Sequence, residues 1–428
     1  MLKSKLSIAR LKKTLSGAYI RNVGWMAGAE IANRIIRLAS TVILARMFSA
    51  QDYGLMAIIY TVSDFFQVFT LRGGVGSKII QADEEDVIAI CNTAYWLNWI
   101  VCGSLFIIQC VVVLLLPYFS GDRTLTLPLI AVAFTYLAYP FYIIHLILIE
   151  RENRFKATAF CNVAVSLVSS IVTATLALLG MGIWSIIWSM IATFPVWIIL
   201  AWRYQSWRPP LRFSLEKWRD VLGFGSNLLI NDLLIKFRSN VDYLIVGKYL
   251  GVEALGIYYF AFNAGSGITM SILSTFMSPM YPYICSVRND YVQFKKRYFS
   301  SLKKVTLILV PLILLQALLA PIYVPIVFGS KWIPAIPVLI LICLSVIPSI
   351  YGWAATLLLN SINKPRISLQ ISLIFTTIFI ISLFAVVKAG ILWVASTVFL
   401  VHLVVTSISS IWINRFALNQ KHFLKGSL

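Results

Sequence analysis

Two apolar stretches of this chain carry acids and bases at the spacing of a helix. Glu30 is followed by Arg34 four residues later and by Arg37 after seven, and Asp232 is followed by Lys236 after four. Residues four apart lie on one face of an α-helix, so each acid lies next to a base. Such a face could bind phosphate, because arginine presents a fork of N–H groups that matches phosphate oxygens.

Further polar residues extend the two stretches. Asn33 widens the first into a polar stripe, and the second continues into a broader polar arc. Asp64 lies midway along another apolar stretch, where it is either a cavity residue or the partner of a neighbouring arginine. The candidate substrate-binding residues are Arg34, Arg37, Lys236, Arg238, Glu30, Asp232, Asp64, Asn240 and Asp242.

Two interpretations of these residues remain open. An ionisable group in mid-bilayer costs about 3 kcal/mol and normally faces the interior of a helix bundle or water. The charges either line a water-filled cavity or neutralise one another in ion pairs that fix helix packing. Pairing alone leaves the broad polar arc around Asp232 unexplained, which favours the cavity. The six cysteines lack metal-ligand spacing, and we expect no cofactor.

The elements that position these residues are transmembrane helices. The chain is 60% hydrophobic and 12% charged, with a mean hydropathy of +0.86. One bilayer crossing needs about 20 apolar residues. We therefore predict an all-α polytopic membrane protein with about twelve transmembrane helices, at 22–47, 53–78, 89–116, 125–149, 157–179, 182–202, 221–247, 255–280, 302–327, 334–360, 367–387 and 391–413.

The net charge of +20 reflects topology rather than nucleic-acid binding. If the N-terminus is cytoplasmic, most Lys and Arg residues fall on the inner side, which is the known bias of membrane proteins. The outer side then receives only Arg46, Arg123, Lys248, Lys331 and Lys388. Both termini are predicted to be cytoplasmic. The inner side contains an N-terminal segment (1–21), a linker (203–220), a connection (281–301) and a tail (414–428).

The sequence also repeats weakly. A shift of 202 residues places Gly54 on Gly256 and Arg46 on Lys248, and a shift of 208 places Pro140 on Pro348. The repeat predicts two pseudo-symmetric lobes of six helices, 22–202 and 221–413. Six is an even number, so the axis relating the lobes runs along the membrane normal, as in transporters whose site lies between two halves.

Four segments carry a family resemblance. They read ILARMFSAQDYG (43–54), GVGSKIIQ (74–81), SNVDYLIVGKYLGVEALGIYYFA (239–261) and VPIVFGSKW (324–332). They resemble Wzx-type flippases of lipid-linked oligosaccharides, in the polysaccharide-transporter branch of the MOP superfamily. The third segment contains the residues around which the family pattern is usually written: Asn240, Asp242, Gly251 and Leu255 to Tyr258.

The resemblance implies a MOP/MATE-like bundle that alternates between inward-open and outward-open states. Its substrate would be a polyprenyl-diphosphate-linked oligosaccharide, moved from the cytoplasmic to the outer leaflet of a bacterial inner membrane. Membrane lipids, a polysaccharide polymerase and a chain-length regulator are the other candidate partners. Cationic cavity residues are typical of these flippases, but here the acids are as many as the bases.

Two rival functions differ in the chemistry they need. A MATE-type drug or cation antiporter would use unpaired carboxylates, such as Glu30, Asp64 or Asp232, and the four bases argue against a cationic cargo. A membrane polymerase or glycosyltransferase would need a sizeable extramembrane loop with catalytic groups. The loops are short and carry no nucleotide-binding motif, so the chain is predicted not to be an enzyme.

Overall fold

The computed structural model describes the backbone of residues 18–70, 72–120, 124–209, 212–288 and 290–419. Most of the predicted N-terminal segment and the end of the predicted tail lie outside these residues. The described residues form helices and no strand. The first part of the chain contains α2 (Ala18–Met47), α3 (Ala50–Phe69), α4 (Arg72–Gln81), α5 (Val87–Ser120), α6 (Thr126–Ala138), η1 (Tyr139–Phe141), α7 (Ile143–Arg151), α8 (Phe155–Leu178) and α9 (Trp184–Tyr204).

The second part begins with a long helix and continues through helices that contain short 3₁₀ or π segments. Its elements are α10 (Trp218–Leu250), α11 (Val252–Phe262), η2 (Asn263–Gly267), α12 (Ile268–Cys285), α13 (Tyr291–Tyr323), η3 (Val324–Phe328), η4 (Ser330–Ala335), α14 (Ile336–Ser361), α15 (Pro365–Val386), η5 (Val387–Ala389), α16 (Ile391–Val401), η6 (His402–Thr406) and α17 (Ser407–Ala417).

Helices cover every predicted span. Among the described residues, seven helical segments are long and apolar enough to cross a membrane, or eight if the bent pair Thr126–Phe141 and Ile143–Arg151 forms one span. The other predicted spans fall on α2, α3, α10 and on α11 with α12. Three of these helices, α2, α3 and α10, carry the candidate site, and their charged residues lower their hydropathy. The chain is a multi-pass membrane protein, and twelve crossings stay a prediction.

Two details differ from the predicted spans. The fourth span is bent by 45° between its two helices, next to Pro140, which lacks the N–H that an uninterrupted helix needs. The predicted connection 281–301 is also largely helical, because α13 already begins at Tyr291. The Asp290 carboxylate caps that helix by accepting a bond from the Gln293 backbone N–H at 3.0 Å.

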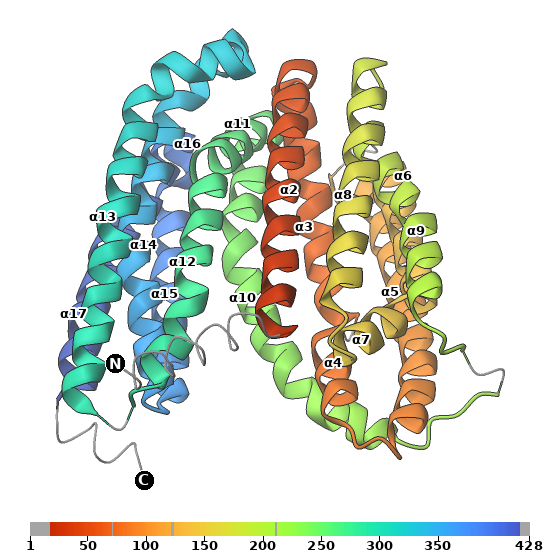
Figure 1. The fold of residues 1–428 in the computed structure, drawn as a ribbon. Coiled ribbons are helices and arrows are strands. Elements are labelled where there is room, and N and C mark those ends of the chain that lie inside the picture. Colours follow the sequence, from red (N-terminus) through yellow and green to blue (C-terminus); the bar gives the residue numbers. More distant parts are fainter. Residues whose placement is uncertain (1–17, 71, 121–123, 210–211, 289, 420–428) are drawn as a thin grey trace. The chain divides into compact units, whose positions relative to one another are not determined.

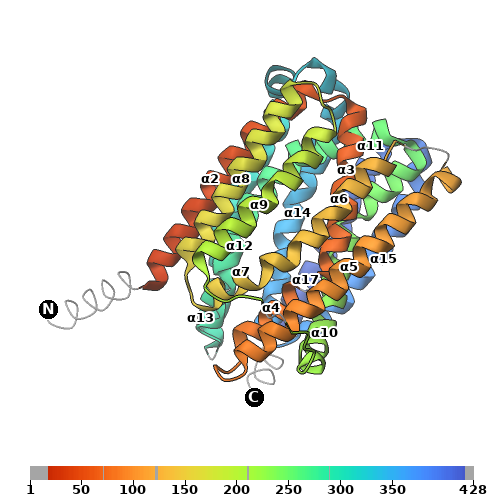
Figure 2. The same cartoon turned by 90° about the vertical axis from the view of Figure 1, so that its right-hand side faces the viewer.

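The chain forms two compact units, and each is described here by itself. Unit one comprises Met1–Phe48 and Ile59–Phe237, and unit two comprises Ser49–Ile58 and Arg238–Leu428. In unit one, α2 packs along α8, and α8 packs along α9 (Figure 2). In unit two, α12 lies beside α13 (Figure 1), and both pack on α14. The two lobes that the repeat suggests, 22–202 and 221–413, stay a prediction.

The first turns of α3 and α11 meet within unit two at two glycines. A Cβ at Gly256 would lie 1.7 Å from the Ala50 carbonyl oxygen, and one at Gly54 would lie 1.9 Å from that of Val252. No side chain can occupy either position without separating the helices. The 202-residue shift pairs Ala50 with Val252 and Gly54 with Gly256. The two contacts are therefore equivalent, because each glycine lies against the carbonyl of the first residue of the other helix.

Candidate functional site

The polar stripe of α2 forms on one helix face, as its spacing predicts. Arg34 Nε donates to Glu30 Oε1 at 3.0 Å, and the Glu30 side chain is 56% exposed. Arg37, one turn further along, is exposed. Its guanidinium has no carboxylate within ion-pair distance in the described part of the chain, so it is available to an anionic ligand. The Asn33 side-chain oxygen is buried beside these groups without a hydrogen-bond donor.

A second ion pair joins α3 to the part of α10 that belongs to unit one. Lys236 Nζ lies 2.8 Å from Asp64 Oδ2, and both side chains are a little over one third exposed. The ring of Phe65 meets the ring of Phe237 edge-on beside this pair, with centroids 6.3 Å apart. Asp64 is therefore paired with a lysine, whereas the sequence left open a cavity residue or the partner of a neighbouring arginine. The choice depends on helix packing, since the two residues are 172 positions apart.

Asp232 shows how the two repeats differ in detail. It occupies the position equivalent to Glu30, but its side chain is exposed and forms no ion pair with any described residue. Lys236, the equivalent of Arg34, reaches Asp64 on another helix instead. The repeat therefore preserves the spacing of acid and base without preserving the pairing.

The remaining candidates lie on the second half of α10, in unit two. Arg238 Nη1 donates to the Ser372 hydroxyl of α15 at 2.7 Å. Asn240 and Asp242 are only 6% and 4% exposed. The Asp242 carboxylate accepts from the Tyr258 hydroxyl at 2.8 Å and from the Tyr243 backbone N–H at 3.0 Å. Asp242 thus packs within unit two rather than lining an open surface.

The structure therefore divides the candidate residues into two groups. Six of them lie in unit one, and these are Glu30, Arg34, Arg37, Asp64, Asp232 and Lys236. Arg238, Asn240 and Asp242 lie in unit two. A cavity between two halves stays a prediction. The described residues contain no group of three or more His, Cys, Asp or Glu side chains that could hold a metal ion.

Tyr258 and Ser372 are contact residues that sequence reasoning did not propose as partners of the candidate charges. Tyr258 belongs to the family motif, and it lies 16 residues after Asp242 across the turn at Gly251. Its hydroxyl could have been matched with the intramembrane acid, because buried polar groups normally pair. Nothing local marks Ser372, which lies 134 residues from Arg238.

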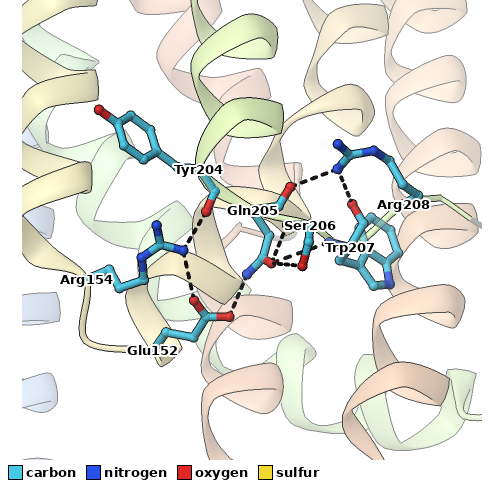
Figure 3. Close-up of polar contacts among 7 residues, drawn as sticks. All are labelled: Glu152, Arg154, Tyr204, Gln205, Ser206, Trp207 and Arg208. Carbon is cyan, nitrogen blue, oxygen red and sulfur yellow. Dashed lines mark hydrogen bonds and ion pairs between the residues drawn. The ribbon is translucent and has the colours of Figure 1, made fainter.

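A third polar cluster lies in unit one, where α9 ends (Figure 3). The Gln205 side-chain amide donates to Glu152 at 2.8 Å, and Arg154 donates to the Tyr204 carbonyl at 2.6 Å. Arg208 donates to the Gln205 carbonyl at 2.8 Å. These bonds fasten the start of the 203–220 linker to the turn between α7 and α8. Their role is to anchor the linker, because each charged group is engaged by its neighbours.

Comparison with known proteins identifies relatives of the whole bundle. A family profile described as "Polysaccharide biosynthesis protein" matches residues 43–337. The "Lipopolysaccharide biosynthesis protein WzxC" of Escherichia coli (strain K12) is 27% identical over 346 residues, which cover 78% of this chain and 66% of that protein. The chain thus spans about two thirds of the length of the curated relatives it matches.

Solved structures share the fold at low sequence identity. The lipid II flippase MurJ, in an inward closed conformation, matches with a TM-score of 0.70 and 14% identity over 94% of this chain and 89% of MurJ. An inward-facing multidrug resistance transporter of the MATE family matches with a TM-score of 0.69 and 14% identity, over 92% of this chain and 96% of the transporter. The MATE-like all-helical fold predicted from the sequence is confirmed.

Proposed function

Since the chain belongs to the polysaccharide biosynthesis protein family, we propose that it is a flippase for a polyprenyl-diphosphate-linked oligosaccharide. The lipid-linked repeat unit would cross from the cytoplasmic to the outer leaflet of a bacterial inner membrane by alternating access. The names of two similar proteins support this class of substrate, because WzxC is a lipopolysaccharide biosynthesis protein and MurJ is a lipid II flippase.

The cationic face of α2 is the observation that carries the proposal. Arg34 is paired with the exposed Glu30, and Arg37 next to it is exposed and has no ion pair with a described residue. An arginine inside a span is unfavourable by about 3 kcal/mol on insertion scales, so its presence in a span calls for a functional explanation. A diphosphate would supply two groups of acceptor oxygens, which the forks of Arg34 and Arg37 can bind side by side.

The proposal extends to topology and partners. Both termini would be cytoplasmic, because that orientation places most Lys and Arg residues on the inner side. The chain would make and break no covalent bond. A polysaccharide polymerase and a chain-length regulator would act on the repeat units that it delivers.

A MATE-type antiporter is the rival that shares the fold, and two contacts argue against it. Coupling to protons or sodium would need carboxylates that are free to bind the ion. Glu30 is paired with Arg34, and Asp64 is paired with Lys236. Of the three carboxylates that an antiporter could use, Asp232 is the one without an ion pair among the described residues. The cationic residues would also repel the cationic drugs that such antiporters carry.

Replacing Arg37 tests the flippase proposal. Translocation of lipid-linked repeat units should fall by about tenfold to a hundredfold in Arg37→Ala, the loss expected for one or two charge-assisted hydrogen bonds. The variant should accumulate in the membrane normally, because Arg37 neutralises no buried acid. Arg37→Lys should recover part of the activity, since the charge returns without the fork. The measurement is the amount of repeat unit that reaches the outer leaflet, per molecule of inserted protein.

The double variant Arg37→Ala/Glu30→Ala separates phosphate binding from structural pairing. If Arg37 binds phosphate, removal of Glu30 cannot restore translocation. An active double variant, or an Arg37→Ala protein that transports at the normal rate, would refute the role of Arg37. Instability of the single variant that is cured in the double one would instead assign Arg37 to packing.

A further inference from the structure

An apolar groove of about 460 Å³ runs along α13 in unit two, with Tyr351 of α14 at its side. Its α13 residues follow the three- and four-residue spacing of one helix face. They are Phe299, Leu302, Lys303, Thr306, Leu307, Val310 and Pro311. Lys303 is the only charged side chain among the residues that line the groove.

The same face of α13 becomes basic toward the start of the helix. Lys295 and Lys296 precede Phe299 by four and three residues, so they continue the face that lines the groove. Both lysines and Lys303 are exposed, and none of the three forms an ion pair with a described residue. One helix face therefore presents three cations and then an apolar channel.

The dimensions of this face match one leaflet of a membrane. α13 has 33 residues, so it is about 50 Å long and exceeds the hydrocarbon core of roughly 30 Å. Its basic end therefore extends to the headgroup region, on the side that the excess of Lys and Arg predicts to be cytoplasmic. The 15 residue steps from Lys296 to Pro311 rise about 22 Å, which corresponds to one headgroup and one leaflet of acyl chain.

The hydrogen bonding of α13 is incomplete at two positions beside the groove. The Thr306 hydroxyl is buried and makes no hydrogen bond. Pro311 has no N–H to donate to the carbonyl of Leu307 one turn earlier. An unpaired polar group is unfavourable in hydrocarbon.

We propose that this groove binds an anionic glycerophospholipid of the cytoplasmic leaflet. Its phosphate lies between Lys296 and Lys303, and one acyl chain lies along Leu307 and Val310. The cations select a net negative headgroup over a zwitterionic one, since each lysine near the surface favours an anionic lipid. The site is independent of the α2 residues proposed to bind the transported substrate, which lie in unit one.

Lys303→Gln tests the site, with Lys304→Gln as the matched control. Lys304 is also exposed and lies at nearly the same depth, but it does not line the groove. The protein is placed in nanodiscs of phosphatidylcholine containing a minority of phosphatidylglycerol, and the lipid retained after extraction is counted by native mass spectrometry. Retained phosphatidylglycerol should fall about fivefold in Lys303→Gln and change little in Lys304→Gln. An equal fall in both variants would mean that lipid retention follows the overall surface charge, and it would overturn the site.

Two further measurements identify the occupant. Val310→Phe fills the groove without changing charge, and it should also release the phosphatidylglycerol. A normal lipid count in that folded variant would overturn the placement of the acyl chain. Polyprenyl phosphate added to loaded nanodiscs should leave the count unchanged. Its one-for-one displacement of phosphatidylglycerol would assign the groove to the transported lipid instead. Neither result depends on transport, so the site and the flippase proposal fail separately.

Discussion

In unit one, the ion pairs of α2, α3 and α10 remain partly exposed, whereas Asn240 and Asp242, which α10 contributes to unit two, are buried. Glu30 and Arg34 pair at 3.0 Å, and Asp64 and Lys236 pair at 2.8 Å. In unit two, the Asp242 carboxylate is 4% exposed and is held by hydrogen-bond donors on its own and a neighbouring helix. One helix, α10, supplies residues to both arrangements.

The difference separates two reasons for placing polar groups in a span. A buried acid needs groups that donate hydrogen bonds to it, and losing one of these donors destabilises the protein. A partly exposed ion pair contributes about 0–1 kcal/mol to stability. Stability therefore explains why Asp242 and Tyr258 occur together, but it does not explain Arg34, Arg37 and Lys236. We infer that the charges of unit one serve the substrate and that Asp242 serves packing.

The largest effect on folding is expected at the glycine contact of unit two. A Cβ in Gly256→Ala would lie 1.7 Å from the Ala50 carbonyl oxygen and 2.8 Å from the Gly54 nitrogen, so α3 and α11 must separate. We expect a loss of about 1–3 kcal/mol or more, measured as thermal stability in detergent. Gly28→Ala is the control, because nothing lies within 4 Å of its Cβ. Equal stability of the two variants would contradict the close crossing.

A smaller loss is expected when the Asp242–Tyr258 bond is broken. Asp242→Ala leaves the Tyr258 hydroxyl without its acceptor, which should cost about 1–2 kcal/mol of stability. Tyr258→Phe in the same chain should recover part of that loss, since the unsatisfied hydroxyl is then removed. Transport per folded molecule should change less than twofold. An Asp242→Ala protein that folds normally and transports nothing would show instead that Asp242 acts on the substrate.

The smallest effect on stability is expected at the ion pair between α3 and α10. Lys236→Ala should cost about 1 kcal/mol or less, because both side chains are over one third exposed. Transport should nevertheless fall, since a cation facing the substrate is lost. The charge swap Asp64→Lys/Lys236→Asp distinguishes the two roles. Full transport in the swapped protein would show that the pair is structural and would remove the contrast between the units.

Local sequence was sufficient for the features that depend on helix periodicity. Apolar runs predicted a helix at every span, and the spacing of four predicted the pairing of Glu30 with Arg34. The repeat singled out Gly54 and Gly256, and the reason is now visible as a backbone contact. These features depend on residues near one another in the chain, or on a pattern that occurs twice in it.

Tertiary structure alone decided which partner each remaining charge takes. Asp232 and Lys236 have the same spacing as Glu30 and Arg34, yet Lys236 pairs with Asp64, which is 172 residues away. Arg238 and Asp242 lie one turn apart on one helix. Asp242 is buried and accepts a bond from the Tyr258 hydroxyl, whereas Arg238 donates to the Ser372 hydroxyl. A helix fixes the direction of a side chain, whereas packing fixes what lies in that direction. The sequence therefore determined the helices and their polar faces, and the fold determined which of those faces became ion pairs, buried bonds or exposed cations.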